Sequence, residues 1–172
     1  MKKSSINPEE CNSFYHNYLK LVDDDASLLD SLYLGKERTI RFYGAISNDK
    51  LNYAYAEGKW TILEVLQHVI DTERIFAYRV LRIARNDKTE LAGFDQDDYI
   101  KPSQANSRNI EDLLEEYSAL RTSNIYMIQA IPEECFKNEA IVSGGRMTAR
   151  AAAFIMLGHE IHHANIIQER YL

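Results

Sequence analysis

The sequence predicts an all-α protein, a four-helix bundle in a single domain, and three observations support this prediction. The chain has 172 residues, close to the roughly 150-residue size expected of one domain. It contains only 7 Gly and 3 Pro, which favours long uninterrupted elements over many short strands. Four long stretches carry apolar residues at the spacing of an amphipathic helix. We therefore expect at least two-thirds helix and no sheet of consequence.

Residues 1–25 are predicted to form an N-terminal helical extension that precedes the bundle. Its apolar residues recur at helical spacing, and an acidic run at 23–25 interrupts them. The first bundle helix is predicted over 26–46, although Gly35 and Gly44 lower its intrinsic helix propensity.

The second bundle helix is the most regular in the chain. Thr61 and Glu64 have the spacing of a capping box ahead of an apolar run. The helix is predicted to continue to about Arg85. Its apolar side chains share one broad face, formed by Ile62, Leu66, Val69, Phe76, Ala77, Val80 and Ala84.

A long polar connection, residues 86–108, follows the second helix. Ordered loops of this length are uncommon and often functional. The third helix is predicted to begin near Ser107 or Asn109 and to stop at Pro132, because proline cannot continue a helix.

The last helix is predicted over 149–170. Gly144 and Gly145 indicate a turn within 141–147, and Thr148 then caps the helix. Four long helices joined by one extended crossover make a four-helix bundle.

The composition excludes several classes of protein. Lys and Arg number 20 against 26 Asp and Glu, a net charge of −6, so the basic surface of a general nucleic-acid binder is not expected. The longest apolar run, 151–158, is too short to cross a bilayer, and the basic start lacks the apolar stretch of a signal peptide. Cys11 and Cys135 are too few for a disulfide framework. We expect a cytoplasmic protein without nucleic-acid or membrane partners.

Three of the 5 histidines lie in the last helix, and two of them form the most informative motif. His159 and His163 are four residues apart, so both imidazoles project from one face. That face is otherwise apolar and includes Ala152, Ile155, Met156, Ile166 and Ile167. Imidazole is a frequent ligand of divalent metals. A metal site is therefore favoured over two histidines that merely form hydrogen bonds in the core.

The segment His159-Glu160-x-x-His163 also matches the HExxH motif of zinc metalloproteases. In those enzymes the third protein ligand often comes from further along the chain. No histidine follows His163 here, and the single nearby acid is Glu169. The third ligand is therefore expected upstream, and the metalloprotease interpretation is the weaker one.

His68 is the natural upstream candidate for a third ligand. It lies about two turns into the second helix, beside the broad apolar face, and the alternative is a histidine at the boundary between core and surface. His162 is about 60° from the stripe of the pair, where it either supports the site or is a partly exposed neighbour. His16 lies in the N-terminal region and is assigned no role.

Glu73 breaks the apolar pattern of the second helix. It falls near the centre of the apolar face, where an unpaired carboxylate would be very unfavourable. Two interpretations remain open. Glu73 either forms a buried ion pair with an arginine or holds a metal-ligating histidine in place. The arginines considered as partners are Arg74, Arg79, Arg121, Arg150 and Arg170.

Two sequence motifs contain most of these residues. They are Gly58-Lys59-Trp60-Thr61-x-x-Glu64-x-x-x-His68, followed by Asp71 and Glu73-Arg74, and Gly158-His159-Glu160-x-His162-His163, followed by Glu169-Arg170-Tyr171-Leu172. With them, the chain from about Leu28 to Leu172 resembles the DinB-like family, the DinB/YfiT group of four-helix metal proteins. The resemblance implies that His68, His159 and His163 bind one divalent ion, with zinc or nickel expected. It also implies one domain over 1–172 and an up-down-down-up bundle whose long crossover joins helices two and three.

Three histidine ligands leave coordination positions open for water or substrate, as in catalytic zinc sites. A bound metal can activate water for attack on a carbonyl or phosphoryl centre, or activate a thiolate. The resemblance implies a metal-dependent enzyme acting on a small molecule, by hydrolysis or by transfer of a low-molecular-weight thiol. The alternative is a non-catalytic, stress-related metal-binding module.

Other residues are candidates around the site or at an interface. Those considered to support the metal ligands are Glu73, Arg79 and His162. Those considered to contact substrate are Tyr53, Tyr55, Arg79, Arg146 and the 86–108 crossover. A homodimer is expected from the resemblance and from interface-type aromatic residues in the N-terminal third, namely Tyr15, Tyr18, Tyr33 and Tyr43.

Overall fold

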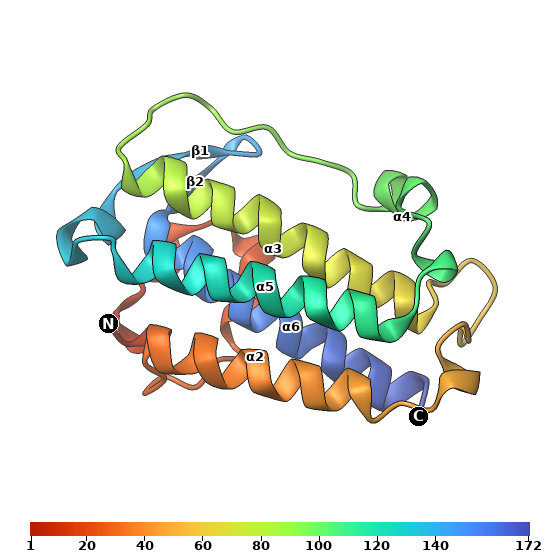
Figure 1. The fold of residues 1–172 in the computed structure, drawn as a ribbon. Coiled ribbons are helices and arrows are strands. Elements are labelled where there is room, and N and C mark those ends of the chain that lie inside the picture. The colour runs from red at the N-terminus through yellow and green to blue at the C-terminus, as the bar shows by residue number, and fades with distance from the viewer.

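The computed structural model describes residues 1–172 and shows four long helices packed side by side (Figure 1). The bundle helices are α2 (Leu28–Gly44), α3 (Ile62–Ala84), α5 (Ile110–Gln129) and α6 (Ala149–Arg170). The other elements are short: α1 (His16–Leu19), α4 (Asp97–Ser103), β1 (Glu139–Val142) and β2 (Gly145–Thr148). Helices, 3₁₀ turns included, take up 66% of the chain, which confirms the mostly helical prediction. No helix combines the length and the apolar character that crossing a membrane requires.

The second and third bundle helices, α3 and α5, run side by side in the same direction. At one end, Thr61 Oγ1 donates a hydrogen bond to Asn106 Oδ1 over 2.6 Å, and further along Arg74 contacts Glu116 at 2.5 Å. Thr61 precedes Arg74 in the sequence, and their partners Asn106 and Glu116 follow in the same order, so the two helices are parallel. The chain therefore has to cross the length of the bundle between the end of α3 and the start of α5. The connection over 85–109 does so and carries α4 on its way (Figure 1).

The predicted start of α3 is confirmed. Thr61 Oγ1 accepts from the Glu64 backbone N–H at 3.2 Å, and Glu64 Oε2 accepts from the Thr61 N–H at 2.8 Å, which completes a capping box. The helix ends at Ala84, next to the predicted Arg85. Both neighbours of this helix, α5 and α6, pack on it, so it is buried over most of its length.

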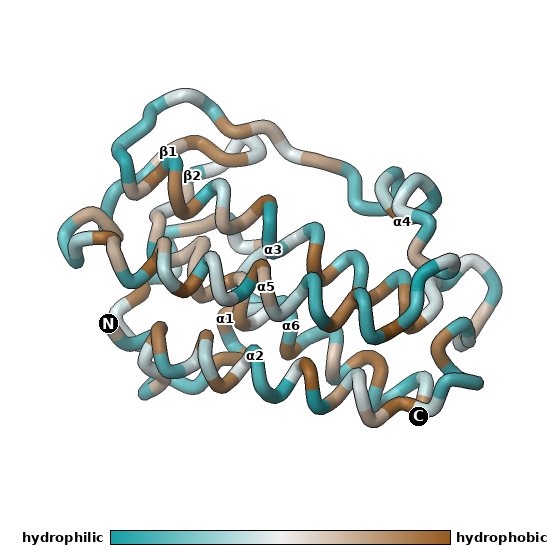
Figure 2. The backbone as a smooth tube through the Cα atoms, viewed as in Figure 1, coloured by the Kyte–Doolittle hydropathy of each residue, from teal (hydrophilic) through white to brown (hydrophobic).

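A polar layer divides the apolar core into two parts. One part surrounds the second half of α3 and the first half of α6, and the other surrounds the first half of α3, the start of α5 and the end of α6. In Figure 2 the bundle helices alternate between hydrophobic and hydrophilic residues along their length, as amphipathic helices do. The polar layer consists of Thr72, Glu73, Arg121, Asn124, His159 and Glu160, all of them buried.

The segment predicted as an N-terminal helical extension is helical only in short pieces. Residues 1–25 form short 3₁₀ turns and the four-residue α1. Asn7 and Asn12 have extended ψ angles at the start of a turn, which separates each turn from the one before, and the Asn12 side chain accepts from the Phe14 N–H at 2.9 Å. The segment is fixed to the rest of the molecule by Glu10, whose carboxylate accepts from Thr148 Oγ1 at 2.7 Å and pairs with Arg150.

Gly158 explains how closely this N-terminal segment approaches α6. A Cβ at this position would overlap the backbone carbonyl of Tyr18 in α1. The first half of α6 is therefore covered by α1 as well as by α2 and α3, and it is buried nearly all round.

The turn predicted within 141–147 is confirmed, and it connects the two strands of a small hairpin. Strands β1 and β2 pair antiparallel, and the two residues between them, Ser143 and Gly144, have φ of 51° and 74°. Positive φ at both central residues is typical of a type I′ hairpin turn. The four residues 139–142 are too few to indicate a strand without this turn.

Glu73 is buried, as predicted, and its partner is Arg121 of α5. Arg121 donates to the two carboxylate oxygens of Glu73 at 2.7 and 2.8 Å and to Glu160 of α6 at 2.5 Å. Burial disfavours a charge on Arg121, but the two carboxylates outweigh it and raise its pKa well above its ordinary value. Gly35 of α2 leaves room for the Glu160 carboxylate, because a Cβ there would overlap it. Arg121 Nη1 also donates to the Leu32 carbonyl oxygen of α2 at 3.3 Å, so the network joins all four bundle helices.

We predict that Glu73→Leu destabilises the protein by about 3 kcal/mol or more, because it leaves buried donors of Arg121 and Asn124 without an acceptor. Glu73→Gln retains an acceptor oxygen and should lose about half as much. Urea unfolding monitored by circular dichroism measures both. Exposed Glu115 on α5 provides the control, since Glu115→Leu should change stability by less than about 0.5 kcal/mol. Equal stability of both Glu73 variants and wild type would contradict the network.

We also predict that Gly158→Ala destabilises the protein by about 1–3 kcal/mol, since the added methyl group would push α1 away from α6. Gly44→Ala is the matched control, because a Cβ there lies 3.6 Å from Leu114, an ordinary contact. That control should be neutral or stabilising. If Gly158→Ala unfolds at the same urea concentration as wild type, α1 does not pack as described.

Candidate metal centre

Three histidines from two helices meet at the middle of the bundle. His68 comes from α3, and His159 and His163 come from α6, where they are one turn apart. His68 is 4% exposed and His159 5% exposed, and His163 is partly buried. One ligand atom from each lies within 4.8 Å of the others. The structure therefore brings together the three histidines that the sequence selected.

The geometry of the three rings fits a shared cation better than it fits hydrogen bonds. His159 Nε2 lies 3.0 Å from His68 Nε2 and 3.1 Å from His163 Nε2. An imidazole nitrogen carries either one proton or one lone pair, so His159 Nε2 can form one good hydrogen bond with these neighbours but not two. Tetrahedral zinc with Zn–N bonds of about 2.0–2.1 Å would separate its nitrogen ligands by about 3.3 Å, close to both distances.

The protonation states also suit a metal. Burial lowers the pKa of His68 to about 4, and His162 adds a smaller effect in the same direction. Burial, together with the neighbouring histidines, holds the pKa of His159 and of His163 well below the ordinary value. All three rings are therefore neutral at physiological pH and have a lone pair for a cation.

Aromatic and hydroxyl side chains surround the three rings. Trp60 packs on His68 with a centroid distance of 4.8 Å, and Thr72 Oγ1 lies 3.5 Å from His68 Nδ1. Tyr18 of α1 packs edge-on against His159 with a centroid distance of 5.4 Å. The contribution of Tyr18 was not foreseen. The one signal for it in the sequence was Gly158, an otherwise unfavourable residue inside a helical pattern.

The metalloprotease interpretation of His159-Glu160-x-x-His163 does not fit the structure. In that mechanism the glutamate acts as a general base beside the metal. Here Glu160 lies on another side of α6, where it accepts from Arg121 and, at 2.8 Å, from Tyr117 Oη. Its carboxylate is thus engaged in the buried network.

The other histidine and carboxylate candidates make contacts outside the three-histidine group. Glu73 contacts no histidine, since its partners are Arg121 and Asn124, so the ion-pair interpretation applies. His162 is only half-buried and packs against Tyr18 and His163 at the edge of the cluster. His16 does not belong to the three-histidine group, and its Nε2 lies 2.9 Å from the Pro8 carbonyl oxygen.

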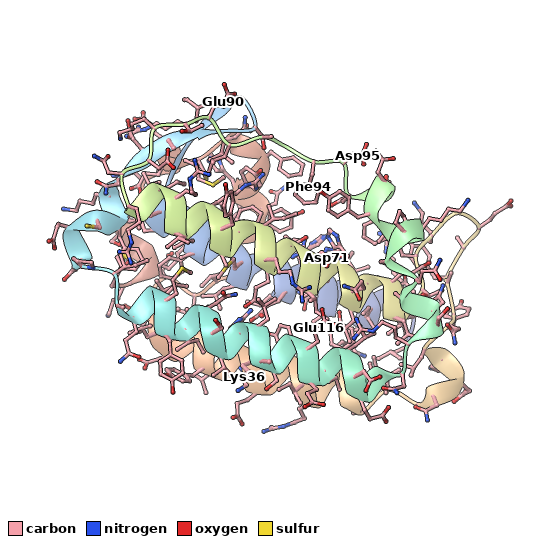
Figure 3. All side chains as sticks on the ribbon, turned by 45° about the horizontal axis from the view of Figure 1, so that its top comes forward. Lys36, Asp71, Glu90, Phe94, Asp95 and Glu116 are labelled. Atoms are coloured by element: carbon pink, nitrogen blue, oxygen red, sulfur yellow. The ribbon has the colours of Figure 1, made fainter.

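A pocket of about 360 Å³ adjoins His159. Its walls are aromatic, with Phe14, Tyr15, Tyr18, Phe76 and Phe94, and its remaining residues are Thr72, Arg79, Asp95, Gln96, Ser143, Ile155 and His159. Figure 3 shows the crossover segment with Phe94 and Asp95 passing over α3. A larger groove of about 590 Å³ lies between α2 and α6 but contains no histidine, so the smaller pocket is the one relevant to the metal centre.

Two of the predicted substrate contacts line this pocket, namely Arg79 and the 86–108 crossover. The others lie elsewhere. Tyr53 and Tyr55 pack on Tyr171, and exposed Arg146 pairs with Glu139. The crossover is more ordered than expected, because α4 and a 3₁₀ turn form within it.

Three solved structures share this fold. YfiT from Bacillus subtilis, described as a probable metal-dependent hydrolase with an unusual four-helix bundle topology, has a TM-score of 0.74 and 16% identity over 83% of this chain and 82% of that one. A mycothiol-dependent maleylpyruvate isomerase has a TM-score of 0.66 and 15% identity over 82% of this chain and 60% of the isomerase. A DinB-like protein (YjoA) from Bacillus subtilis has a TM-score of 0.58 and 19% identity over 83% and 87%.

At these identities the likeness concerns the fold, and the present chain matches less than two-thirds of the isomerase. No curated protein matches the chain significantly. The DinB superfamily matches its sequence over residues 31–167, a stretch that includes all three clustered histidines. The chain therefore belongs to the DinB superfamily.

Proposed function

We propose that this protein is a metal-dependent enzyme that holds one divalent ion, zinc or nickel, on His68, His159 and His163. The observation that carries the proposal is the convergence of three imidazole nitrogens within 4.8 Å inside the bundle. The substrate is a small molecule bound in the adjacent pocket, and the reaction is hydrolysis or transfer of a low-molecular-weight thiol. The likeness to a probable metal-dependent hydrolase and to a mycothiol-dependent isomerase supports both reaction classes.

Two features favour an enzyme over a structural metal site. The group consists of three histidines, whereas structural zinc is usually closed by four protein ligands. The pocket also reaches one of the three, His159, so a small molecule bound there lies beside the metal centre. A bound divalent ion would supply Lewis acidity and would lower the pKa of water or of a thiol.

The residues around the histidines would prepare the site. Thr72 lies at Nδ1 of His68 and favours the ring orientation in which Nε2 faces the other two histidines. Trp60 and Tyr18 cover the rings from two sides and exclude water from the ligand nitrogens. The aromatic walls of the pocket would bind the apolar part of a substrate.

The second candidate is a non-catalytic module in which the ion holds α3 against α6. The location of the site between two bundle helices favours it, because a metal there would stabilise the fold directly. Screening the metal-loaded protein against thiol conjugates and simple esters and amides distinguishes the two. Turnover that is lost on chelation supports the enzyme. Stabilisation by metal without any turnover supports the module.

Two architectural points belong to the same proposal. We infer an up-down-down-up bundle, which the parallel contacts of α3 with α5 support. We also infer that residues 1–172 fold as one domain, which the contacts of Glu10 with the start of α6 support.

The histidine assignment predicts how metal content changes in five alanine variants. His68→Ala, His159→Ala and His163→Ala each leave two imidazoles, so the purified proteins should retain little of the one ion per chain found in wild type. The controls His162→Ala and His16→Ala should retain it, since neither ring belongs to the group. The metal content of each purified protein is measured by inductively coupled plasma mass spectrometry.

Binding should also raise the stability of metal-retaining variants by about 2.7 kcal/mol at a hundredfold excess of metal over Kd. Thermal melts with and without chelator check this. Loss of metal in His162→Ala together with retention in His163→Ala would contradict the assignment.

The homodimer stays a prediction, but only one of the four aromatic residues expected at its interface remains for that role. Tyr43 is buried and Tyr15 and Tyr18 line the pocket, so Tyr33, which is 50% exposed on α2, remains for an interface together with its exposed neighbour Leu34. Light scattering at micromolar concentration should give twice the 19.9 kDa chain mass. A monomer at high micromolar concentration would overturn the prediction.

A further inference from the structure

Arg79 is a buried arginine without a carboxylate partner. Its side chain is 2% exposed, and Nη2 donates hydrogen bonds to Ser143 Oγ at 3.2 Å and to the Ala92 carbonyl at 3.4 Å. Its Nη1 is buried and has no hydrogen-bond partner. The other fully buried arginine, Arg121, pairs with two carboxylates.

An unpaired buried guanidinium is unfavourable, because arginine keeps its charge in proteins. Burial lowers the pKa of Arg79, and Tyr15 beside it offsets part of this effect. The Phe76 ring contributes a cation–π contact at 4.7 Å. None of these neighbours supplies a negative charge, so the site is complementary to an anion from outside the chain.

The guanidinium belongs to the same pocket as the metal centre. Arg79 and His159 both line the pocket of about 360 Å³, together with five aromatic side chains. Phe76 packs on Arg79, and Tyr18 packs on His159. The single acid on its rim, Asp95, is exposed and accepts a hydrogen bond from the Asp97 backbone N–H at 3.0 Å. Asp95 therefore bonds within its own segment and forms no ion pair with Arg79.

We propose that the pocket binds a small-molecule carboxylate, with the carboxylate on the Arg79 guanidinium and the body of the molecule between the aromatic rings. This inference deepens the proposed function and rests on it, since it places the other end of the substrate at the three histidines. Along the axis of α3, Arg79 lies about 16 Å from His68. The ligand is thus an elongated molecule of several carbons with a terminal carboxylate.

A single carboxylate fits better than a phosphate ester. Arg79 is the one Arg or Lys side chain that lines the pocket, and its hydrogen-bond partners are the Ser143 hydroxyl and the Ala92 carbonyl oxygen. The unpaired Nη1 carries two N–H groups that can donate to a carboxylate, whose charge of minus one matches that of the guanidinium. A phosphate dianion would retain an uncompensated charge in an aromatic pocket.

The test compares an acid with its neutral isostere on chelator-treated protein. Calorimetric titration of wild type with 4-phenylbutyrate and with 4-phenylbutyramide should show at least tenfold tighter binding of the carboxylate. Arg79→Met should abolish this preference, and Arg79→Lys should retain part of it. Arg82→Met is the matched control, because Arg82 lies one turn on in α3, pairs with Asp87 and does not line the pocket. It should keep the wild-type preference.

Equal binding of acid and amide to wild type would overturn the proposal, as would an unchanged preference in Arg79→Met. If Arg79→Met does not fold by circular dichroism, the wild-type comparison and Arg79→Lys decide. The carboxylate preference is measured without metal, and metal content is measured without the probe. A chain that binds the acid but no metal therefore refutes the proposed function alone, and a chain that binds metal but does not prefer the acid refutes this inference alone.

Discussion

The convergence of three imidazole nitrogens between α3 and α6 is the constraint to which the rest of the bundle is adapted. Polar rings in an apolar core need hydrogen-bond partners or a bound cation. His159 Nε2 lies near 3 Å from two other ring nitrogens and cannot form a good hydrogen bond with both. The same level of the bundle holds the Glu73–Arg121–Glu160 network. The core is consequently two apolar parts separated by a polar layer, and the helices must keep their register for both clusters to form.

The N-terminal segment forms part of the pocket that adjoins this layer. It crosses α6 closely at Gly158 and places Phe14, Tyr15 and Tyr18 around one side of the histidines. The crossover adds Phe94 to the lining of the same pocket. Three segments outside the four bundle helices, namely the N-terminal segment, the crossover and the hairpin turn at Ser143, thus line the pocket, and α3 and α6 supply the rest, including Arg79 and His159.

The features predictable from the sequence were those with local causes. The capping box at Thr61 fixes the start of α3, and the spacing of His159 and His163 places both rings on one face, whatever their surroundings. The partner of Glu73 was not predictable, because Arg121 lies 48 residues away and was one of five arginines. Contacts of Tyr18 with α6 depend on tertiary packing across the whole chain and leave little periodic signal.

X-ray absorption spectroscopy of the zinc-loaded protein tests the central claim most directly. The three-histidine assignment predicts nitrogen and oxygen scatterers at about 2.0–2.1 Å, with the multiple-scattering pattern of three imidazoles. Sulfur at about 2.3 Å, which would implicate Cys11 or Cys135, or a pattern with fewer than two imidazoles, would contradict it.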